Sequence, residues 1–346
     1  MQTDPQGSAS FSAESYFATQ PAPASLDNDR QRVRAFVRRQ SEQGNKVVLV
    51  TSGGTTVPLE RNMVRFLDNF SAGTRGATSA EYFLKAGYAV IFMHRQFSLQ
   101  PFSRHYSHST NPFLDFLEIE HKPAPNESLS TTPEITVTPE KREDLLSVLT
   151  AYKKVHRDGT MLTLSFVTVN DYLWLLRGVS EELSEMGRDA MYYLAAAVSD
   201  FFLPRQKMSE HKIQSGKGSL HIEMDQVPKI LKPMVDEWTR EGFIVSFKLE
   251  TDPQLLLPKC RQALERYGHQ VVIGNDLNRR KFEVVFVSRI APKKDPAHPA
   301  ATNIDDDTFT ESWLRLSEKD THTREIEEDI VNELVRRHRT WMNNGR

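Results

Sequence analysis

One stretch, residues 47–76, sets the strongest limit on how this chain can fold. It opens with the apolar run VVLV, continues through Gly53 and Gly54, and ends in the segment SAGTRG, after which a helical pattern begins. A short unbroken aliphatic run is typical of a strand that is buried on both faces, and glycines directly after it permit a sharp turn. The amides and the dipole of a helix start favour an anion. The stretch therefore predicts an α/β core with an anion-binding turn.

Length and composition narrow the class of protein. With 346 residues, the chain can form two domains or one domain with insertions, and we prefer the second. Its 44 Lys and Arg residues against 46 Asp and Glu residues give a net charge of −2, which excludes a general basic surface for nucleic acid. A single cysteine, Cys260, excludes an internal disulfide framework. We expect no membrane span, because no apolar run approaches about 18 residues.

The first 26 residues differ in composition from the rest of the chain. They are rich in Ser, Ala, Gln and Pro, and they lack both an early Arg and an apolar segment. This composition fits neither a secretory nor a mitochondrial leader. We therefore predict a disordered tail over residues 1–26 and a single α/β domain over residues 27–346.

Strand and helix patterns alternate along that domain. Apolar strand patterns occur at residues 47–50, 88–95, 161–169, 191–198, 243–252, 269–276 and 282–288. Helical patterns lie between most of them, and a hairpin-like connection joins the last two. Prolines interrupt the chain at about residues 100–139, and residues 291–307 show no periodicity, so we predict irregular insertions at both places. The alternation predicts an α/β fold: a three-layer, Rossmann-like, mostly parallel sheet with an antiparallel element near its end and a proline-rich insertion.

Four polar stretches directly follow predicted strands. They are TSGGT at 51–55, AAAVSDF at 195–201, SFKLETD at 246–252 and GNDL at 274–277. The carboxyl ends of parallel strands converge on one crevice in such sheets. We therefore expect the four stretches to form one ligand-binding site.

These motifs, together with VRFLDNFSAGTRGATSAE and EHKIQS, resemble phosphopantothenoylcysteine synthetase of the eukaryotic type. The resemblance keeps the order of the motifs and covers roughly residues 45–280 outside the insertion. It implies a ligase of coenzyme A biosynthesis that condenses 4'-phosphopantothenate with L-cysteine via an acyl-adenylate, converting ATP to AMP and pyrophosphate. Bacterial relatives use CTP, so the choice of ATP rests on similarity to the eukaryotic motif, notably at Lys248.

The resemblance also implies the molecular setting. We expect Mg²⁺ to accompany ATP and to be held mainly by phosphates, so that its protein ligands stay unassigned. We expect a homodimer that acts on small molecules, with neither nucleic acid nor membrane as a partner. The expected location is the cytoplasm, with the nucleus as a further compartment.

By the same resemblance, individual site residues can be named. Two are expected to be catalytic, Lys212, on a loop able to close over the triphosphate, and Asn69. The nucleotide is expected to contact Gly53, Ser71, Gly73, Gly76, Phe247, Lys248 and Asn275. Phosphopantothenate is expected to contact Asn69, Ala196, Ala197, Asp200 and, from the neighbouring subunit, Arg65.

Two other functions remain open at this point. An NADP-dependent oxidoreductase is the strongest rival on the same fold, because His94 and Arg95 end the second strand where an NAD enzyme carries an acid, and Arg95 could serve NADP. A non-catalytic regulatory subunit is the third reading, favoured by the proline-rich insertion and the tail. The presence of Lys212, Asn69 and Asp200 argues against that reading. The sequence departs from the family pattern at Ala72, where NFSSG reads NFSAG.

Overall fold

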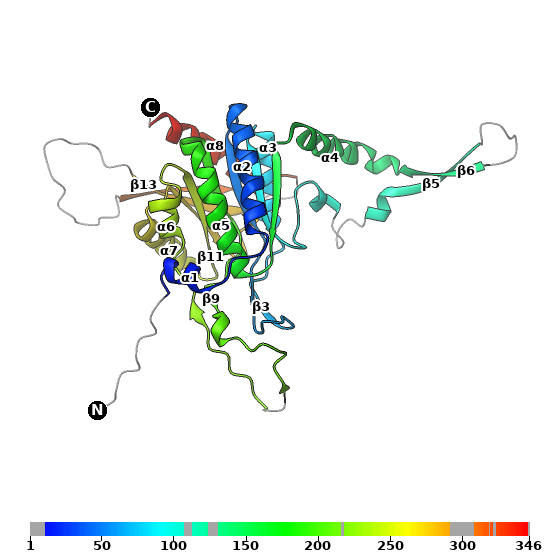
Figure 1. Ribbon diagram of the computed structural model, residues 1–346. Coiled ribbons are helices and arrows are strands. Elements are labelled where there is room, and N and C mark those ends of the chain that lie inside the picture. The colour runs from blue at the N-terminus through cyan, green and yellow to red at the C-terminus, as the bar shows by residue number, and fades with distance from the viewer. Residues whose placement is uncertain are drawn as a thin grey trace, which may run out of the picture.

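An eight-stranded sheet forms the centre of the molecule, in the strand order β14-β13-β12-β11-β8-β1-β4-β7 (Figure 1). The structure is a computed structural model. It describes residues 11–106, 113–123, 131–215, 218–290, 308–317, 319–320 and 323–344.

The elements have the following bounds. The strands of the large sheet are β1 (Val47–Ser52), β4 (Ala89–Arg95), β7 (Met161–Phe166), β8 (Ala190–Leu194), β11 (Phe243–Glu250), β12 (Val271–Asp276), β13 (Glu283–Arg289) and β14 (Phe309–Arg315). The short strands are β2 (Thr56–Pro58), β3 (Phe66–Asp68), β5 (Leu117–Pro123), β6 (Thr131–Val137), β9 (Phe201–Phe202) and β10 (Asp225–Gln226). The α-helices are α1 (Ala13–Thr19), α2 (Leu26–Glu42), α3 (Thr74–Lys85), α4 (Pro139–Asp158), α5 (Val169–Leu183), α6 (Leu231–Pro233), α7 (Pro253–Tyr267) and α8 (Ile326–Asn343). Within the described ranges, none of the helices is long and apolar enough to cross a membrane.

The strand order places the switch point of the sheet between β1 and β8. β1 pairs in parallel with β4 on one side and with β8 on the other. From β1 the chain builds outward through β4 to β7, and it then returns to build outward through β8 and β11 to β12. This is the predicted Rossmann-like arrangement. β13 and β14 pair antiparallel to their neighbours, which confirms the predicted antiparallel element.

Alternation along the strands gives the sheet an apolar core on each face. In β1, Val47 and Leu49 belong to one core and Val48 and Val50 to the other, and all four are fully buried. α2 and α5 cover the first face, and α3 and α8 cover the second. α7 packs against β12 and β13 in a smaller cluster. The unbroken aliphatic run in β1 is thus explained by burial on both sides, and the three-layer prediction is confirmed.

The prediction of a disordered tail over residues 1–26 is wrong for its second half. Within α1, Tyr16 and Phe17 are buried against the first core. Tyr16 Oη also donates a hydrogen bond to Asn170 Oδ1 at 3.1 Å. Two aromatic anchors therefore hold a segment whose average composition is polar. Residues 1–10 lie outside the described residues.

The insertion predicted at about residues 100–139 is more regular than its prolines suggest. β5 and β6 pair as an antiparallel hairpin, and α4 follows directly. Hairpin and helix extend away from the body of the molecule (Figure 1). The second predicted insertion, residues 291–307, falls outside the described ranges.

Replacing Tyr16 with alanine should lower the free energy of unfolding by about 3 kcal/mol, because the change deletes a buried aromatic ring and leaves a cavity. Urea unfolding followed by circular dichroism measures this loss. Glu14→Gln, at an exposed position of the same helix, is the matched control and should change the free energy by less than about 0.5 kcal/mol. Equal stability of the two variants would show that α1 does not pack on the sheet.

Candidate active site

The candidate site lies at the switch point, where β1 and β8 end. The turns after these strands are joined by backbone hydrogen bonds: Ala197 N–H donates to the Gly53 carbonyl at 2.8 Å, and Thr55 N–H donates to the Ala197 carbonyl at 3.0 Å. Ala196 N–H donates to Thr51 Oγ1 at 3.2 Å. Ala196 and Ala197 are only partly buried. A ligand can therefore lie close to this backbone without meeting a large side chain.

Asn69 lies against the same pair of turns. Its N–H donates to the Thr55 carbonyl at 3.1 Å, and a Cβ added to Gly54 would lie 1.6 Å from the Asn69 carbonyl oxygen. The two backbones are therefore in direct contact. Asp200, six residues beyond the end of β8, has an exposed side chain, and its carbonyl accepts from Val227 N–H at 2.9 Å. The structure thus brings Asn69 together with the turns after β1 and β8, and Asp200 follows on the loop from β8.

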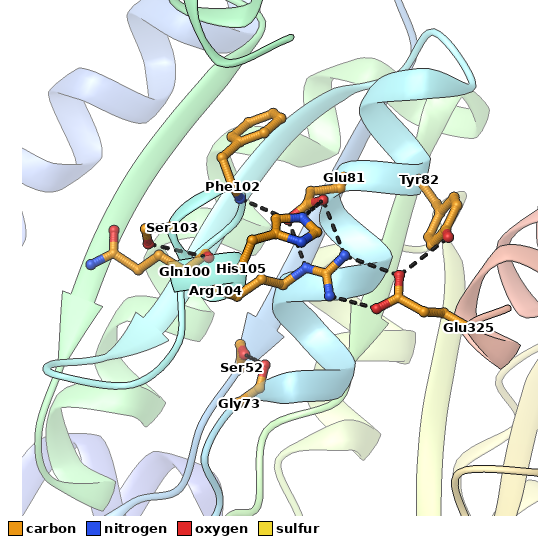
Figure 2. A network of polar contacts seen from close by, with 10 residues as sticks. All are labelled: Ser52, Gly73, Glu81, Tyr82, Gln100, Phe102, Ser103, Arg104, His105 and Glu325. Atoms are coloured by element: carbon orange, nitrogen blue, oxygen red, sulfur yellow. Dashed lines mark hydrogen bonds and ion pairs between the residues drawn. The ribbon is translucent and has the colours of Figure 1, made fainter. Parts of the chain in front are cut away.

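The start of α3 supplies an anion-binding position. Gly73 precedes the helix with a φ of 84°, a left-handed conformation that favours glycine. The structure shows no side-chain cap on this helix, and Ser71 Oγ accepts from Gly73 N–H at 3.3 Å. Ser52 Oγ, at the end of β1, donates to the Gly73 carbonyl at 3.0 Å (Figure 2). The first-turn amides of α3 are therefore available to a phosphate beside the end of β1.

Gly76 has a packing role in addition to the predicted nucleotide contact. It is buried in the first turn of α3, and a Cβ added there would lie 2.4 Å from Ser52 Oγ. Close packing of helix on strand is the role of the last glycine in dinucleotide-binding turns. Gly76 therefore lets α3 sit directly on β1, and its direct contact with a nucleotide remains a prediction.

The predicted nucleotide residues on β11 and β12 separate onto two faces. Phe247 packs edge-to-face on Tyr193 with ring centroids 5.0 Å apart, on the face that α3 covers. Asn275 also reaches α3, because its Oδ1 accepts from Arg75 Nη2 at 3.3 Å. Lys248 follows Phe247 and lies on the opposite face, in a cavity of about 60 Å³ with Arg266 of α7. The structure therefore groups the side chains of Phe247 and Asn275 with α3. Asn275 Nδ2 donates to the Lys248 carbonyl at 3.4 Å, but the side chain of Lys248 lies on the opposite face of the sheet.

Arg75 is a residue of the site that the sequence analysis missed. Its guanidinium bridges the start of α3 to Asn275 and to Glu327 of α8, the latter at 2.9 Å, and it also bonds the Arg280 carbonyl. Only 16% of the side chain is exposed. Burial raises the pKa of Glu327, and the charge of Arg75 opposes that rise. Arg75 lies between Gly73 and Gly76 in SAGTRG, and this position was the sequence signal from which its role could have been predicted.

A second ion network connects α3 to the segment after β4 and to the residue before α8. Arg104 donates to Glu81 of α3 at 2.7 Å and to Glu325, just before α8, at 2.6 Å (Figure 2). His105 contacts the same Glu81 carboxylate at 3.0 Å. Burial raises the pKa of Glu81, but the hydrogen bonds from His105 and Arg104 outweigh burial and leave it below the ordinary value. The segment after β4 thus holds α3 and α8 together.

Glu60 connects two loops that carry predicted site residues. Its buried carboxylate accepts from Arg65 N–H at 2.9 Å, from Arg65 Nη1 at 3.0 Å, from Ile213 N–H at 3.2 Å and from Val64 N–H at 3.3 Å. The Arg65 amide contributes most to lowering the pKa of Glu60, which falls to about 2 although desolvation opposes the change. Lys212, the neighbour of Ile213, has an exposed side chain. Glu60, within the motif VPLE, was the second site residue that the sequence analysis missed.

The residues of this region do not form a protein cage for a metal. Within the described residues, no group of three or more His, Cys, Asp or Glu side chains could hold a metal ion. The donors at the site are instead backbone amides, amide side chains and cations. Such a set suits a Mg²⁺ ion that is bound chiefly by the phosphates of its nucleotide.

Comparisons with known proteins agree on one family. Residues 43–110 and 150–289 match the family described as the DNA/pantothenate metabolism flavoprotein C-terminal domain. The chain is 44% identical over 351 residues to phosphopantothenate–cysteine ligase CAB2 of Saccharomyces cerevisiae, covering 95% of this chain and 86% of that protein. It is 43% identical over 323 residues to phosphopantothenate–cysteine ligase of Homo sapiens, covering 93% and 96%.

A solved structure shares the whole architecture. A mutant of Cab2 in complex with phosphopantothenate-cysteine matches with a TM-score of 0.81 and 44% sequence identity, covering 96% of this chain and 99% of that chain. The DNA/pantothenate metabolism flavoprotein of Streptococcus pneumoniae matches at 16% identity with a TM-score of 0.51 over 86% of this chain, which supports the fold alone.

Replacing Glu60 with glutamine should destabilise the protein at neutral pH and much less in acid. Because the pKa of Glu60 falls from 4.5 to about 2 on folding, its ionised form stabilises the fold above the ordinary pKa, and this contribution is lost as the pH falls toward 2. Urea unfolding of both proteins between pH 7 and pH 2.5 measures the difference. Glu265→Gln, at an exposed position of α7, is the control and should show no such trend. A stability difference for Glu60→Gln that is independent of pH would contradict the assignment.

Proposed function

Because the chain belongs to the phosphopantothenate–cysteine ligase family, we propose that it condenses 4'-phosphopantothenate with L-cysteine in coenzyme A biosynthesis. The observation that carries the proposal is the identity of 43–44% to ligases over more than nine-tenths of the chain. The geometry agrees with this activity, because the switch point offers an anion-binding helix start beside an exposed backbone and an asparagine. The cytoplasm is the proposed location, with the nucleus as a further compartment.

The reaction proceeds in two steps. A carboxylate oxygen of phosphopantothenate attacks the α-phosphorus of ATP, the bond to the β-phosphate oxygen breaks, and pyrophosphate leaves. The amine of cysteine then attacks the acyl carbon of the adenylate, loses a proton, and expels AMP as the amide forms. No protein nucleophile is needed. Cys260 is consistent with this, because it is buried and burial raises the pKa of its thiol to about 12.

The residues of the site position the reactants and neutralise charge. The first-turn amides of α3 bind phosphate, while Phe247 and Asn275 lie on the same side of the sheet to contact the nucleoside. Lys212 lies on an exposed loop and closes over the triphosphate, where its charge stabilises the phosphates during the attack. Mg²⁺, bound with ATP, supplies further neutralisation of the phosphate charge. Asn69 and Asp200 offer hydrogen-bonding groups to phosphopantothenate.

The apolar residues that are exposed around β2, β3 and β9 support the proposal of a homodimer. Here the β2–β3 surface is the set Met63, Val64, Phe66, Leu67, Phe70 and Phe201, whose exposed fractions run from 43% to 85%. Apolar patches of this kind mark interaction surfaces. Arg65 lies within this surface, and only its Nη1 among the guanidinium nitrogens takes part in the bonds to Glu60 and Ile213. Closure of two copies over this surface would let Arg65 reach the phosphate of a substrate in the neighbouring site.

The structure does not support the alternative of an NADP-dependent oxidoreductase, which depends on a free Arg95. Arg95, the residue that could bind the 2'-phosphate of NADP, is paired with Asp68 at 2.6 Å, and only 19% of its side chain is exposed. His94 is buried. The assay of pyrophosphate release separates the readings, because the ligase requires phosphopantothenate and ATP together, while an oxidoreductase responds to NADPH. Parallel reactions with ATP and CTP identify the nucleotide.

Lys212→Gln should slow adenylate formation by about 100-fold or more, because it removes a positioned charge from the developing phosphate charge. A single-turnover measurement of pyrophosphate release, with all reactants bound, reports this step. Lys85→Gln, at an exposed lysine of α3, is the control and should keep the wild-type rate. An unchanged rate for Lys212→Gln would remove Lys212 from the mechanism.

Mixing two inactive variants tests whether Arg65 acts across the dimer. If Arg65→Ala and Asn69→Ala subunits exchange freely, about a quarter of all sites should combine an intact Arg65 with an intact Asn69, because half of the dimers are mixed and each mixed dimer holds one complete site. Activity should therefore return to about a quarter of the wild-type value after mixing. Absence of any recovery, with subunit exchange verified by mass, would place Arg65 and Asn69 in the same subunit's site.

A further inference from the structure

Asn275 has its side-chain amide held between two groups of opposite hydrogen-bonding character. Its Oδ1 accepts from Arg75 Nη2 at 3.3 Å, and its Nδ2 donates to the Lys248 carbonyl at 3.4 Å. A guanidinium can only donate and a carbonyl can only accept, so both contacts require the same orientation of the amide. A reversed amide would place N–H groups against the guanidinium and an oxygen against the carbonyl. The amide of Asn275 is therefore fixed with its oxygen toward Arg75.

Arg75 can fix this amide because its own guanidinium is held by other partners. Its Nη1 donates to Glu327 Oε1 of α8 at 2.9 Å, and its Nη2 also donates to the Arg280 carbonyl. The side chains of Arg75 and Glu327 are both largely buried. Hydrogen bonds that involve a charged group are strong, and water competes with them little at such a buried position. Arg75 therefore presents one N–H group to Asn275 in a fixed direction.

Asn275 lies next to the region where the nucleotide is proposed to bind, so any role toward the nucleobase rests on the proposed function. It lies near the carboxyl end of the parallel strand β12, and Arg75 lies in the first turn of α3, whose amides are open to phosphate. Phe247, on the neighbouring strand β11, packs on the same side of the sheet. A nucleoside attached to that phosphate would lie along these strand ends, within reach of Asn275 and Phe247.

The hydrogen-bonding groups left on the amide define which nucleobase it can recognise. After the two contacts, Asn275 keeps one N–H of Nδ2 and one lone pair of Oδ1 for a ligand. Adenine carries an amino group beside a ring nitrogen, so it offers one donor and one acceptor to this pair. Hypoxanthine carries an oxygen in place of the amino group and a hydrogen on the adjacent ring nitrogen, so the donor and the acceptor are exchanged. An amide that can reverse pairs with either base, whereas a fixed amide pairs with only one.

We propose that Arg75 is a specificity-determining residue, which holds the Asn275 amide in the one orientation that pairs with adenine and rejects hypoxanthine. Arg75 acts through Asn275, so it positions that amide and does not itself contact the nucleobase. When the guanidinium is removed, the amide can reverse and pair with either base. Cytosine also carries an amino group beside a ring nitrogen, so inosine triphosphate, which carries hypoxanthine, is the informative probe.

Equilibrium binding of ATP and of inosine triphosphate to the full-length protein, with Mg²⁺ and without cysteine, tests the proposal. The wild type should bind ATP at least about tenfold more tightly, because a paired amide discriminates between bases by that order. Arg75→Met should reduce the ratio of the two dissociation constants to about threefold or less. Arg104→Met removes the other buried arginine that connects α3 to the region of α8, and this matched control should keep the wild-type ratio. Equal binding of both nucleotides by the wild type, or an unchanged ratio in Arg75→Met, would overturn the proposal.

Asn275→Ala gives a second test, which holds even if Arg75→Met lowers the stability of the protein. This variant keeps both partners of the Arg75–Glu327 pair and should also reduce the ratio to about threefold or less. Adding Arg75→Met to it should change the ratio no further, because Arg75 acts only through the amide. A retained preference for ATP in Asn275→Ala, or a further change in the double variant, would contradict the proposal. A wild type that prefers ATP but forms no product would overturn the proposed function and leave the role of Arg75 intact.

Discussion

The joining of the β1 turn to the β8 turn is the constraint on which the rest of the site depends. At the switch point the two halves of the sheet build outward in opposite directions, so no helix covers the strand ends between them. Here the gap is bridged by backbone, because Ala197 bonds both Gly53 and Thr55, and Asn69 lies against the same turn. The small side chains of Ala196 and Ala197 leave this backbone open, and their contact with a substrate remains a prediction. In a sheet of this topology a ligand lies in the crevice beyond the strand ends, and here one wall of that crevice is backbone.

Electrostatic contacts then fix what surrounds that crevice. Arg75 pairs with Glu327 of α8, and Arg104 joins Glu81 of α3 to Glu325 just before α8, so the two arginines hold α3 and α8 together. Glu60 likewise connects two loops, since one carboxylate accepts hydrogen bonds from the Arg65 loop and from Ile213 in the loop of Lys212. These are buried or half-buried ion pairs with several hydrogen bonds each, which position groups more than they add stability.

Much of this architecture could be predicted from the sequence, for identifiable reasons. Buried parallel strands are continuous aliphatic runs, as β1 shows, and such runs can be read directly from the sequence. The sequence analysis did not predict β14, because this strand lies half-exposed at the sheet edge and its mostly polar segment shows only a weak apolar pattern. The sequence analysis did not predict α1 either, because its two buried aromatic residues lie in a segment whose average composition is polar. The prolines around β5 and β6 concealed a hairpin that tolerates them at its edges.

Some of the individual site residues could likewise be placed from the sequence, and others could not. Gly73 lies at the start of α3 and Asn69 lies beside the turns after β1 and β8, while their contacts with ligands remain predictions. Lys248 does not join Phe247, and the alternation of side chains along a strand already implied that the two point to opposite faces. Arg75 and Glu60 were missed because a single arginine or glutamate beside a turn is ordinarily solvated, and only three-dimensional packing reveals its partners.

The transfer of an oxygen atom tests the central claim most directly. If a carboxylate is activated on the α-phosphate of ATP at this crevice, phosphopantothenate labelled with ¹⁸O in its carboxylate should deliver one labelled oxygen to AMP and keep one in the amide product. Mass spectrometry of the purified protein's products, with cysteine and Mg²⁺ present, measures both. Label in inorganic phosphate with release of ADP, or AMP without label, would contradict the account.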